Sequence, residues 1–308
     1  MTEAHAQFQC FGSTCETFVI GDAPGRSARE AIALVKSFLL DWHKRFTRFE
    51  AESELSQLNA DPRQVVPVSD AMARFAEAVV RAAQQSGGLV DGTLLSEIET
   101  AGYRKELGPS LPLPRALELA PPRRPAAPSP NPGWTRIGVD RVHRTVTRPV
   151  GVVLDSGGLV KGLAADLLAE TLAPHSTFAI NAAGDVRVGG ASRVPRPVHV
   201  ASPFDGSVLH TFSLVDAGIA TSAIGRRSWL GADGAPAHHL LDPATGNPAF
   251  TGVVQATAIA PTALEAEARA KAAVLSGPER SSAWLRDGGV LVFEDGSHRL
   301  LQPARPGQ

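Results

Sequence analysis

Two long stretches of the chain place apolar residues at helical spacing. Ser27 is a suitable N-cap for the first, which we expect to run from Ser27 to about Phe46. The second covers residues 70–85, with apolar residues at positions 73, 75, 79, 80 and 83, and Ser86-Gly87-Gly88 ends it. The pattern therefore predicts two amphipathic helices in the first third of the chain.

Most of the remaining apolar positions form short runs, many of them alternating with polar residues. These runs predict strands at 18–22, 145–147, 151–154, 178–181, 188–190, 198–200, 212–214 and 253–256, and a helix at 162–172. The strand, helix, strand order around 162–172 suits an α/β or an α+β protein. Because so many strands are short and alternating, we expect an α+β fold with mixed β-sheets and flanking helices rather than a doubly wound parallel sheet.

The composition changes between about residues 107 and 132, where proline, alanine and arginine dominate without an apolar period. We expect this segment to be a surface linker or a partly ordered insertion without chemistry of its own. From about residue 303 we expect a flexible tail. With 308 residues, of which 43% are hydrophobic, the chain can form one large domain or two small ones.

Charge and composition exclude some partners. The formal net charge of −1 provides no basic surface for a nucleic acid. No apolar run reaches the roughly 18–20 residues of a transmembrane segment, and residues 1–9 lack the basic start and apolar core of a signal peptide. We therefore expect a cytoplasmic protein without a transmembrane segment, whose two cysteines, Cys10 and Cys15, are reduced.

Three segments rich in small residues follow predicted strands. Residues 155–162 (DSGGLVKG) lie between a predicted strand and a predicted helix, where backbone N–H groups commonly hold a phosphate. Segments 181–185 and 218–222 place further small residues at two other strand ends. Together they indicate a shared cleft for a dinucleotide. Taken alone, 155–162 is explained about as well by a tight strand-to-helix turn, and we favour an ordinary turn for each of the other two.

Two pairs of charged or titratable residues lie near these segments. His238 and His239 precede an Asp-Pro turn, and an imidazole titrates near neutral pH, so a general base is one interpretation and a structural histidine the other. Arg226 and Arg227 either help to neutralise the charge of a phosphoryl group or form a solvated basic pair, and we favour the solvated pair.

Seven segments, taken in order, resemble the motif series of the FAD:protein FMN transferases, the ApbE-like family. They are CFGST at 10–14, FTRFEAESELSQLN at 46–59, SGGLVDGT at 86–93, DSGGLVKG at 155–162, NAAGD at 181–185, GIATS at 218–222 and HLLDPATG at 239–246. One such match arises easily by chance, but seven in order do not. The resemblance implies a single ApbE-like domain over residues 1–308, bilobal, with FAD bound across a central cleft.

The resemblance also implies the chemistry and the residues that perform it. In the family, a Thr or Ser hydroxyl of an acceptor protein attacks the FMN-side phosphorus of FAD, and AMP leaves. His239 and Lys161 are the implied catalytic residues, and the implied partner is an acceptor protein with a flavinylated Thr/Ser motif. The implied FAD-binding residues are Phe11, Phe49, Leu89, Val90, Asp91, Asp155, Gly157, Gly162, Asn181, Gly184, Thr221 and His239.

The chain departs from the family at the positions expected to bind Mg²⁺. The family places an aspartate and, four residues later, a threonine on one helix turn, but this chain has Glu267 and Lys271. Val160 stands where a main-chain carbonyl completes the site. A protonated lysine cannot ligate Mg²⁺, which prefers oxygen ligands. Either the Lys271 ammonium, held by Glu267, replaces the charge of the metal, or the two residues form an exposed helix pair.

A second departure follows the GIATS segment, where Ala223-Ile224-Gly225 replaces the Gly-Asp-Tyr of the family and removes a polar anchor. Two alternatives to the transferase therefore remain open. The first is an FAD pyrophosphatase that releases FMN and AMP, and the second is a non-catalytic FAD-binding carrier.

Overall fold

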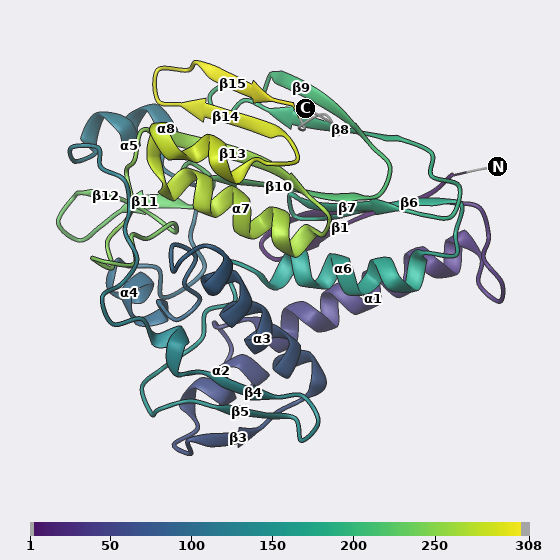
Figure 1. Cartoon of the computed structure of the whole chain (residues 1–308), viewed down its shortest axis with the longest axis horizontal. Coiled ribbons are helices and arrows are strands. Elements are labelled where there is room, and N and C mark those ends of the chain that lie inside the picture. Colours follow the sequence, from purple (N-terminus) through teal and green to yellow (C-terminus); the bar gives the residue numbers. More distant parts are fainter. Residues whose placement is uncertain (1–2, 303–308) are drawn as a thin grey trace.

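The computed structural model of the protein describes residues 3–302 (Figure 1). The helices in this range are α1 (Ala28–Phe46), α2 (Glu54–Ala60), α3 (Asp70–Gln85), α4 (Leu95–Thr100), α5 (Leu113–Leu119), α6 (Val160–Leu172), α7 (Ala263–Leu275) and α8 (Gly277–Arg280), with 3-10 helices η1 (Gly133–Arg136) and η2 (Ser281–Trp284). The strands are β1 (Glu3–Cys10), β2 (Ser13–Ile20), β3 (Val65–Pro67), β4 (Gly138–Asp140), β5 (Thr145–Thr147), β6 (Thr177–Ala182), β7 (Asp185–Gly189), β8 (Arg196–Ala201), β9 (Val208–Leu214), β10 (Ala217–Ala223), β11 (Ser228–Leu230), β12 (Pro236–His238), β13 (Val253–Ala260), β14 (Gly289–Phe293) and β15 (His298–Leu301).

The largest sheet within residues 3–302 has eight strands in the order β1-β2-β6-β7-β10-β13-β14-β15, and each neighbouring pair is antiparallel. Helices α1, α6 and α7 pack side by side on one face, with α1 against β1 and β2, α6 against β6 and β7, and α7 against β10 and β13. Every residue of β13 is buried. The β8–β9 hairpin contacts this strand as well, because Gln255 Nε2 donates to the carbonyl oxygen of Ala201 at 2.8 Å.

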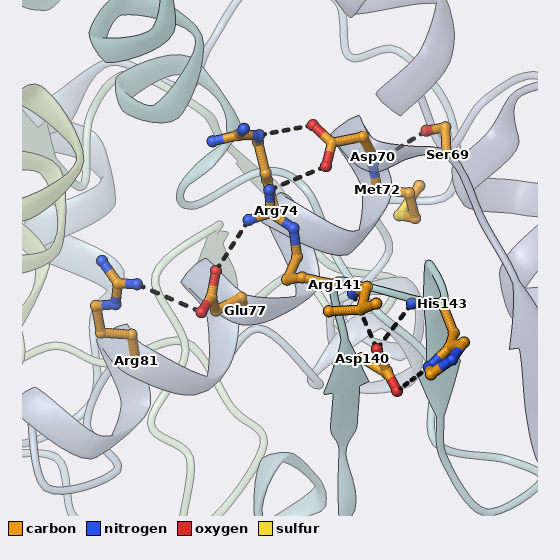
Figure 2. A network of polar contacts seen from close by, with 10 residues as sticks. Ser69, Asp70, Met72, Arg74, Glu77, Arg81, Asp140, Arg141 and His143 are labelled. Carbon is orange, nitrogen blue, oxygen red and sulfur yellow. Dashed lines mark hydrogen bonds and ion pairs between the residues drawn. The ribbon is translucent and has the colours of Figure 1, made fainter.

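A smaller lobe lies below the large sheet in Figure 1 and consists of the sheet β3-β5-β4 with α2 and α3. Helix α3 turns its apolar face, including the fully buried Phe75 and Val79, away from solvent. On its outer face, Asp70 and Glu77 both pair with Arg141 of the β4–β5 turn, at 2.9 and 3.2 Å (Figure 2). Since exposed ion pairs contribute little, apolar burial is what mainly holds this lobe together.

Both long helices predicted from the sequence are confirmed. The Ser27 hydroxyl accepts a hydrogen bond from the Glu30 N–H, and the Glu30 carboxylate accepts one from the Ser27 N–H, so a capping box starts α1. Helix α3 ends where Gly87 and Gly88 adopt φ angles of 61° and 85°, a left-handed conformation that glycine tolerates best.

The α+β class with flanking helices is also confirmed, but the predicted strand at 151–154 is wrong. These residues join no sheet in the described part of the chain. Instead, the Asn59 side chain bonds both the N–H and the C=O of Leu154, each at 2.8 Å, so an amide takes the place of a neighbouring strand. Without that strand, α6 does not connect two parallel strands. The sheets of residues 3–302 accordingly contain only antiparallel neighbours rather than the mixed arrangement we expected.

The proline-rich segment 107–132 is more ordered than a linker. It contains α5, and Leu113 and Ala126 are buried. Main-chain hydrogen bonds fasten it, among them those from the N–H of Leu111 to the Ser228 carbonyl at 2.9 Å and from the N–H of Ala126 to the Leu275 carbonyl at 2.8 Å. The predicted tail from 303 lies outside the described residues, and the single-domain assignment of 1–308 stays a prediction. Within residues 3–302, no helix has both the length and the apolar character needed to cross a bilayer.

Candidate functional site

A cavity of about 460 Å³ lies where the β1–β2 turn, the end of α1, the loop before α6 and the loop after β12 meet. The predicted site residues that line it are Phe11, Phe49, Leu89, Val90, Asp91, Asp155, Gly157, Val160, Lys161, His239 and Lys271. The cavity also takes in Leu107, Gly108 and Ser110, from the segment we expected to carry no chemistry. Five of the seven motif segments therefore contribute residues to one hollow. Residues 181–185 and 218–222 do not line it, contrary to the shared cleft that we expected for these strand ends.

The β1–β2 turn forms one wall. Phe11 and Gly12 adopt φ angles of 56° and 66°, as a two-residue turn between right-twisted strands requires. The carbonyl of Phe11 accepts a hydrogen bond from Arg227 Nη2 at 2.9 Å. Arg227 is thus partly buried against the site and is not part of a solvated pair, whereas Arg226 is exposed.

The segment after α3 forms a second wall. Ser86 Oγ accepts from the Val90 N–H at 2.9 Å, and Asp91 Oδ1 accepts from the Thr93 N–H and hydroxyl at 2.8 and 2.6 Å. Burial raises the pKa of Asp91 above its ordinary value, despite these two hydrogen bonds. The Asp91 carboxyl is thereby fixed in place, and its other oxygen, Oδ2, is buried without a hydrogen-bond partner among residues 3–302.

The loop before α6 is tied to α1 at two points. Ser156 Oγ donates to the Phe46 carbonyl at 2.7 Å, and Trp42 Nε1 donates to the Val160 carbonyl at 3.0 Å. These bonds hold the glycine-bearing turn at the N-terminus of α6 against the cavity.

Four charged side chains form a buried cluster at the end of the cavity near α6 and α7, which we call the charge cluster. Lys161 Nζ lies 2.5 Å from Asp185 Oδ2 and 3.7 Å from Glu267 Oε1, and Lys271 Nζ lies 3.1 Å from the same Glu267 oxygen. Both carboxylate side chains are 1% exposed, and the two lysine side chains are 17% and 12% exposed. The Glu267–Lys271 pair is therefore buried, so the alternative of an exposed helix pair is wrong.

The cluster shifts the pKa values of its members in opposite directions. Burial raises the pKa of Asp185 to about 7, and repulsion from Glu267 adds to the rise. Burial alone would also raise the pKa of Glu267, but Lys271 and Lys161 outweigh it and lower that pKa. Burial would lower the pKa of Lys161, yet Asp185 and Glu267 raise it, so Lys161 stays an ammonium at neutral pH.

The positions expected to bind Mg²⁺ do not fit a divalent cation. The Val160 carbonyl accepts from Trp42, and the Glu267 carboxylate accepts from the Gly162 N–H at 3.0 Å and from Lys271. An ammonium stands at the third position, where a ligand would need a free oxygen. Within residues 3–302, no group of three or more His, Cys, Asp or Glu side chains is arranged to hold a metal ion.

The adjacent histidines have different surroundings. His238 is buried against the Phe250 ring, 4.6 Å away, and its Nδ1 accepts from the Leu240 N–H at 3.2 Å. His239 instead lines the cavity. Burial, followed by the positive charge of Arg227, the neighbouring His238 and the positive charge of Lys271, holds the pKa of His239 well below its ordinary value, so its imidazole is neutral at pH 7.

Four buried polar atoms on cavity-lining residues have no hydrogen-bond partner within the described part of the protein. They are Arg48 Nη1, Asp91 Oδ2, Asp155 Oδ1 and His239 Nδ1. A buried polar group left unpaired costs about 1–3 kcal/mol, so natural proteins rarely keep several together without a use. Their convergence indicates a site built for a polar ligand.

Some predicted site residues lie outside the cavity lining. A Cβ on Gly162 would come within 2.7 Å of the main chain at the start of α7, so this glycine permits close helix packing. Asn181 Oδ1 accepts from the Gly184 N–H at 2.8 Å and closes the turn before Asp185. Thr221 Oγ1 lies 2.8 Å from Thr257 Oγ1, on the sheet. Glu267 lies behind the two lysines, and the roles assigned to all these residues stay predictions.

The sequence-based reading missed several residues that the structure brings to the site. Asp185 ends the NAAGD segment, and only the burial of Lys161 reveals that a carboxylate is needed there. Arg48 and Tyr103 line the cavity together, although 55 positions separate them. One sequence feature pointed to Arg48, because it directly precedes the aromatic Phe49. No sequence pattern pointed to Tyr103.

Fold and site together define an α+β protein with an antiparallel central sheet and a polar cavity closed at one end by buried charges. The model of the ApbE family matches residues 11–293. The chain therefore belongs to the ApbE family.

Two relatives with assigned names cover most of the chain. An FAD:protein FMN transferase of Treponema pallidum (strain Nichols) is 27% identical over 305 residues, which is 92% of this chain and 83% of the relative. The FAD:protein FMN transferase of Escherichia coli (strain K12) is 25% identical over 296 residues, which is 92% of this chain and 82% of the relative.

Solved structures show the same fold. The ApbE protein of Thermotoga maritima superposes with a TM-score of 0.78 at 22% identity and covers 97% of both chains. The apo form of the flavinyl transferase ApbE of Pseudomonas stutzeri gives a TM-score of 0.76 at 20% identity, covering 98% of this chain and 95% of the other.

Proposed function

We propose that this chain is an FAD:protein FMN transferase, which moves the FMN half of FAD onto a Ser or Thr hydroxyl of an acceptor protein and releases AMP. Its family and the names of its relatives support this function. The observation that carries it is the cavity itself, which combines aromatic residues, unpaired buried polar atoms and two buried ammonium groups.

In the proposed reaction, the acceptor hydroxyl oxygen forms a bond to the FMN-side phosphorus of FAD. The bond from this phosphorus to the bridging oxygen breaks, and its electron pair leaves with AMP. The hydroxyl proton passes to His239, whose neutral imidazole can accept it. Burial depresses the pKa of His239 most, and Arg227 and Lys271 add to this effect. The negative diphosphate of bound FAD would offset the two positive charges, making His239 a better base when substrate is present.

Lys161 and Lys271 are proposed to lie beside the diphosphate and to neutralise the charge that develops on its oxygens. Asp185 and Glu267 keep both ammonium groups in place before the substrate binds. Because the residues at the family's metal positions do not fit Mg²⁺, we propose that the Lys271 ammonium supplies the positive charge there. The chain would then transfer FMN without a divalent cation.

A direct experiment tests the transferase. The purified protein is incubated with FAD and an acceptor domain bearing a Ser/Thr-Gly-Ala-Thr-like segment, and the acceptor mass and the AMP released are both measured. We expect the acceptor to gain the mass of FMN less one water, with an equal amount of AMP released. AMP and free FMN without an adduct would instead support an FAD pyrophosphatase. Intact bound FAD, without AMP or adduct across several acceptors, would support a carrier.

A further inference from the structure

Two of the unpaired polar atoms in the cavity face each other. Arg48 Nη1 and Asp155 Oδ1 are 3.7 Å apart, and neither has a hydrogen-bond partner within residues 3–302. The Arg48 side chain is only 8% exposed, so its free N–H groups are directed into a buried space. A donor and an acceptor thus stand side by side, slightly too far apart to bond each other well.

Both groups are held rigidly. Arg48 Nη2 donates to the Tyr103 carbonyl at 2.9 Å, which leaves Nη1 free. Asp155 is fixed through its backbone N–H, which donates to Gly92 at 2.8 Å. A Cβ on Gly157 would come within 3.0 Å of Asp155 Oδ2, so this glycine makes room for the carboxylate. The pair is therefore preorganised for a ligand.

Aromatic rings surround the guanidinium. Arg48 Cζ lies 5.0 Å from the centre of the Phe49 ring and 4.3 Å from that of Tyr103, and the two rings are 5.6 Å apart. Phe49 is 37% exposed and also lines the cavity, so a planar ligand can reach it. The Asp155 carboxylate disfavours a phosphate at this point. The surroundings suit an uncharged aromatic heterocycle whose edge presents an acceptor next to a donor.

We propose that Arg48 and Asp155 together recognise the imide edge of the flavin ring, with Arg48 donating to a ring carbonyl and Asp155 accepting from the adjacent ring N–H. This inference rests on the proposed function, because FAD is its ligand. Adenine also presents an acceptor next to an amino donor. The larger flavin ring covers more of the exposed Phe49 ring, so we assign the pair to the flavin.

Binding measurements on the full chain test this assignment without requiring turnover. The first compares FAD with FAD methylated at the flavin N3, which cannot donate to Asp155. We expect the wild-type protein to bind the methylated compound at least tenfold more weakly, since a hydrogen bond to a charged group is lost. Equal affinities would overturn the proposal. This comparison uses no variant, so it does not depend on the folding of a mutant.

The second measurement uses Arg48→Met, with the exposed Lys44→Met as a control for the lost charge. We expect Arg48→Met to weaken binding of FAD and FMN by about tenfold or more and to leave AMP binding unchanged. Weaker AMP binding with unchanged FMN binding would assign the pair to adenine and overturn the proposal. Unchanged affinity for all three would make the pair merely structural. Neither result determines the outcome of the transfer assay, so failure of this inference can be distinguished from failure of the proposed function.

Discussion

Replacing Lys271 by methionine would remove one ammonium from the charge cluster while keeping an apolar stem beside Gly158. The cluster holds two lysines and two acidic residues, and the change leaves Lys161 as the cation for both Glu267 and Asp185. The pKa of Asp185 is already about 7, so this residue can take up a proton and relieve part of the excess negative charge. Breaking a buried ion pair costs about 3–5 kcal/mol. Glu267 keeps its bond from the Gly162 N–H and a 3.7 Å contact with Lys161, so we expect a loss near the lower end, about 3 kcal/mol.

The effect on activity is separable from the effect on stability. If the Lys271 ammonium stabilises the diphosphate oxygens, its loss should slow transfer by about 100–1000-fold. The double variant Glu267→Gln/Lys271→Met has a neutral cluster again, so it should recover stability in urea unfolding but not the transfer rate. Both variants and a Lys44→Met control are assayed with EDTA and with added Mg²⁺. Wild-type activity that disappears with EDTA and returns with Mg²⁺ would refute the reasoning, as would a fully active Lys271→Met.

Three further variants test other parts of the site and fold. His239→Asn should reduce FMN transfer by about 100-fold or more while FAD still binds, as measured by adduct formation and titration. Burial lowers the pKa of His238 to about 3 in the folded protein. Below about pH 6.5 the unfolded chain therefore binds more protons than the folded one, and the free energy of unfolding decreases as the pH is lowered. From pH 7 to pH 5 this should cost about 2 kcal/mol in urea unfolding, and His238→Asn should abolish that share. Ala183 adopts a φ of 58°, so Ala183→Gly should stabilise the protein by about 0.5–1 kcal/mol in thermal unfolding, and an unchanged midpoint would contradict this.

The parts of the fold that local patterns determine were predictable from the sequence. Helix α3 has the predicted bounds because its apolar spacing and the glycines after it act over a few residues. The segment at 151–154 has the composition of a strand, yet Asn59 bonds Leu154 from far along the chain. A pattern read over a few neighbouring residues cannot reveal that Asn59 is the hydrogen-bond partner of Leu154. For the same reason the sequence left both a linker and a partly ordered insertion open for 107–132, because its main-chain bonds go to distant residues such as Ser228 and Leu275.

The candidate site was predictable where the motifs themselves face the cavity, and less so where they support it. Phe49, Asp91, Asp155 and His239 lie on the cavity wall, as the ordered motifs implied. Gly162, by contrast, belongs to a motif but serves the packing of α6 on α7. A motif shows that certain residues occur together in a family. It does not distinguish residues that contact the ligand from residues that hold those contact residues in place.

The two departures from the family at positions 267 and 271 are best understood as one change. With the family's aspartate at 267, a lysine at 271 would face a carboxylate that is one methylene shorter. With the family's threonine at 271, a glutamate at 267 would keep Lys161 as its single cationic partner among the described residues. Together they form a pair at 3.1 Å, and the longer glutamate also reaches the Gly162 N–H on the neighbouring helix. This pairing supports our proposal that the Lys271 ammonium supplies the charge that a bound cation would contribute. Restoring threonine at 271 without aspartate at 267 should therefore not recreate the family's metal site, because both side chains define its geometry.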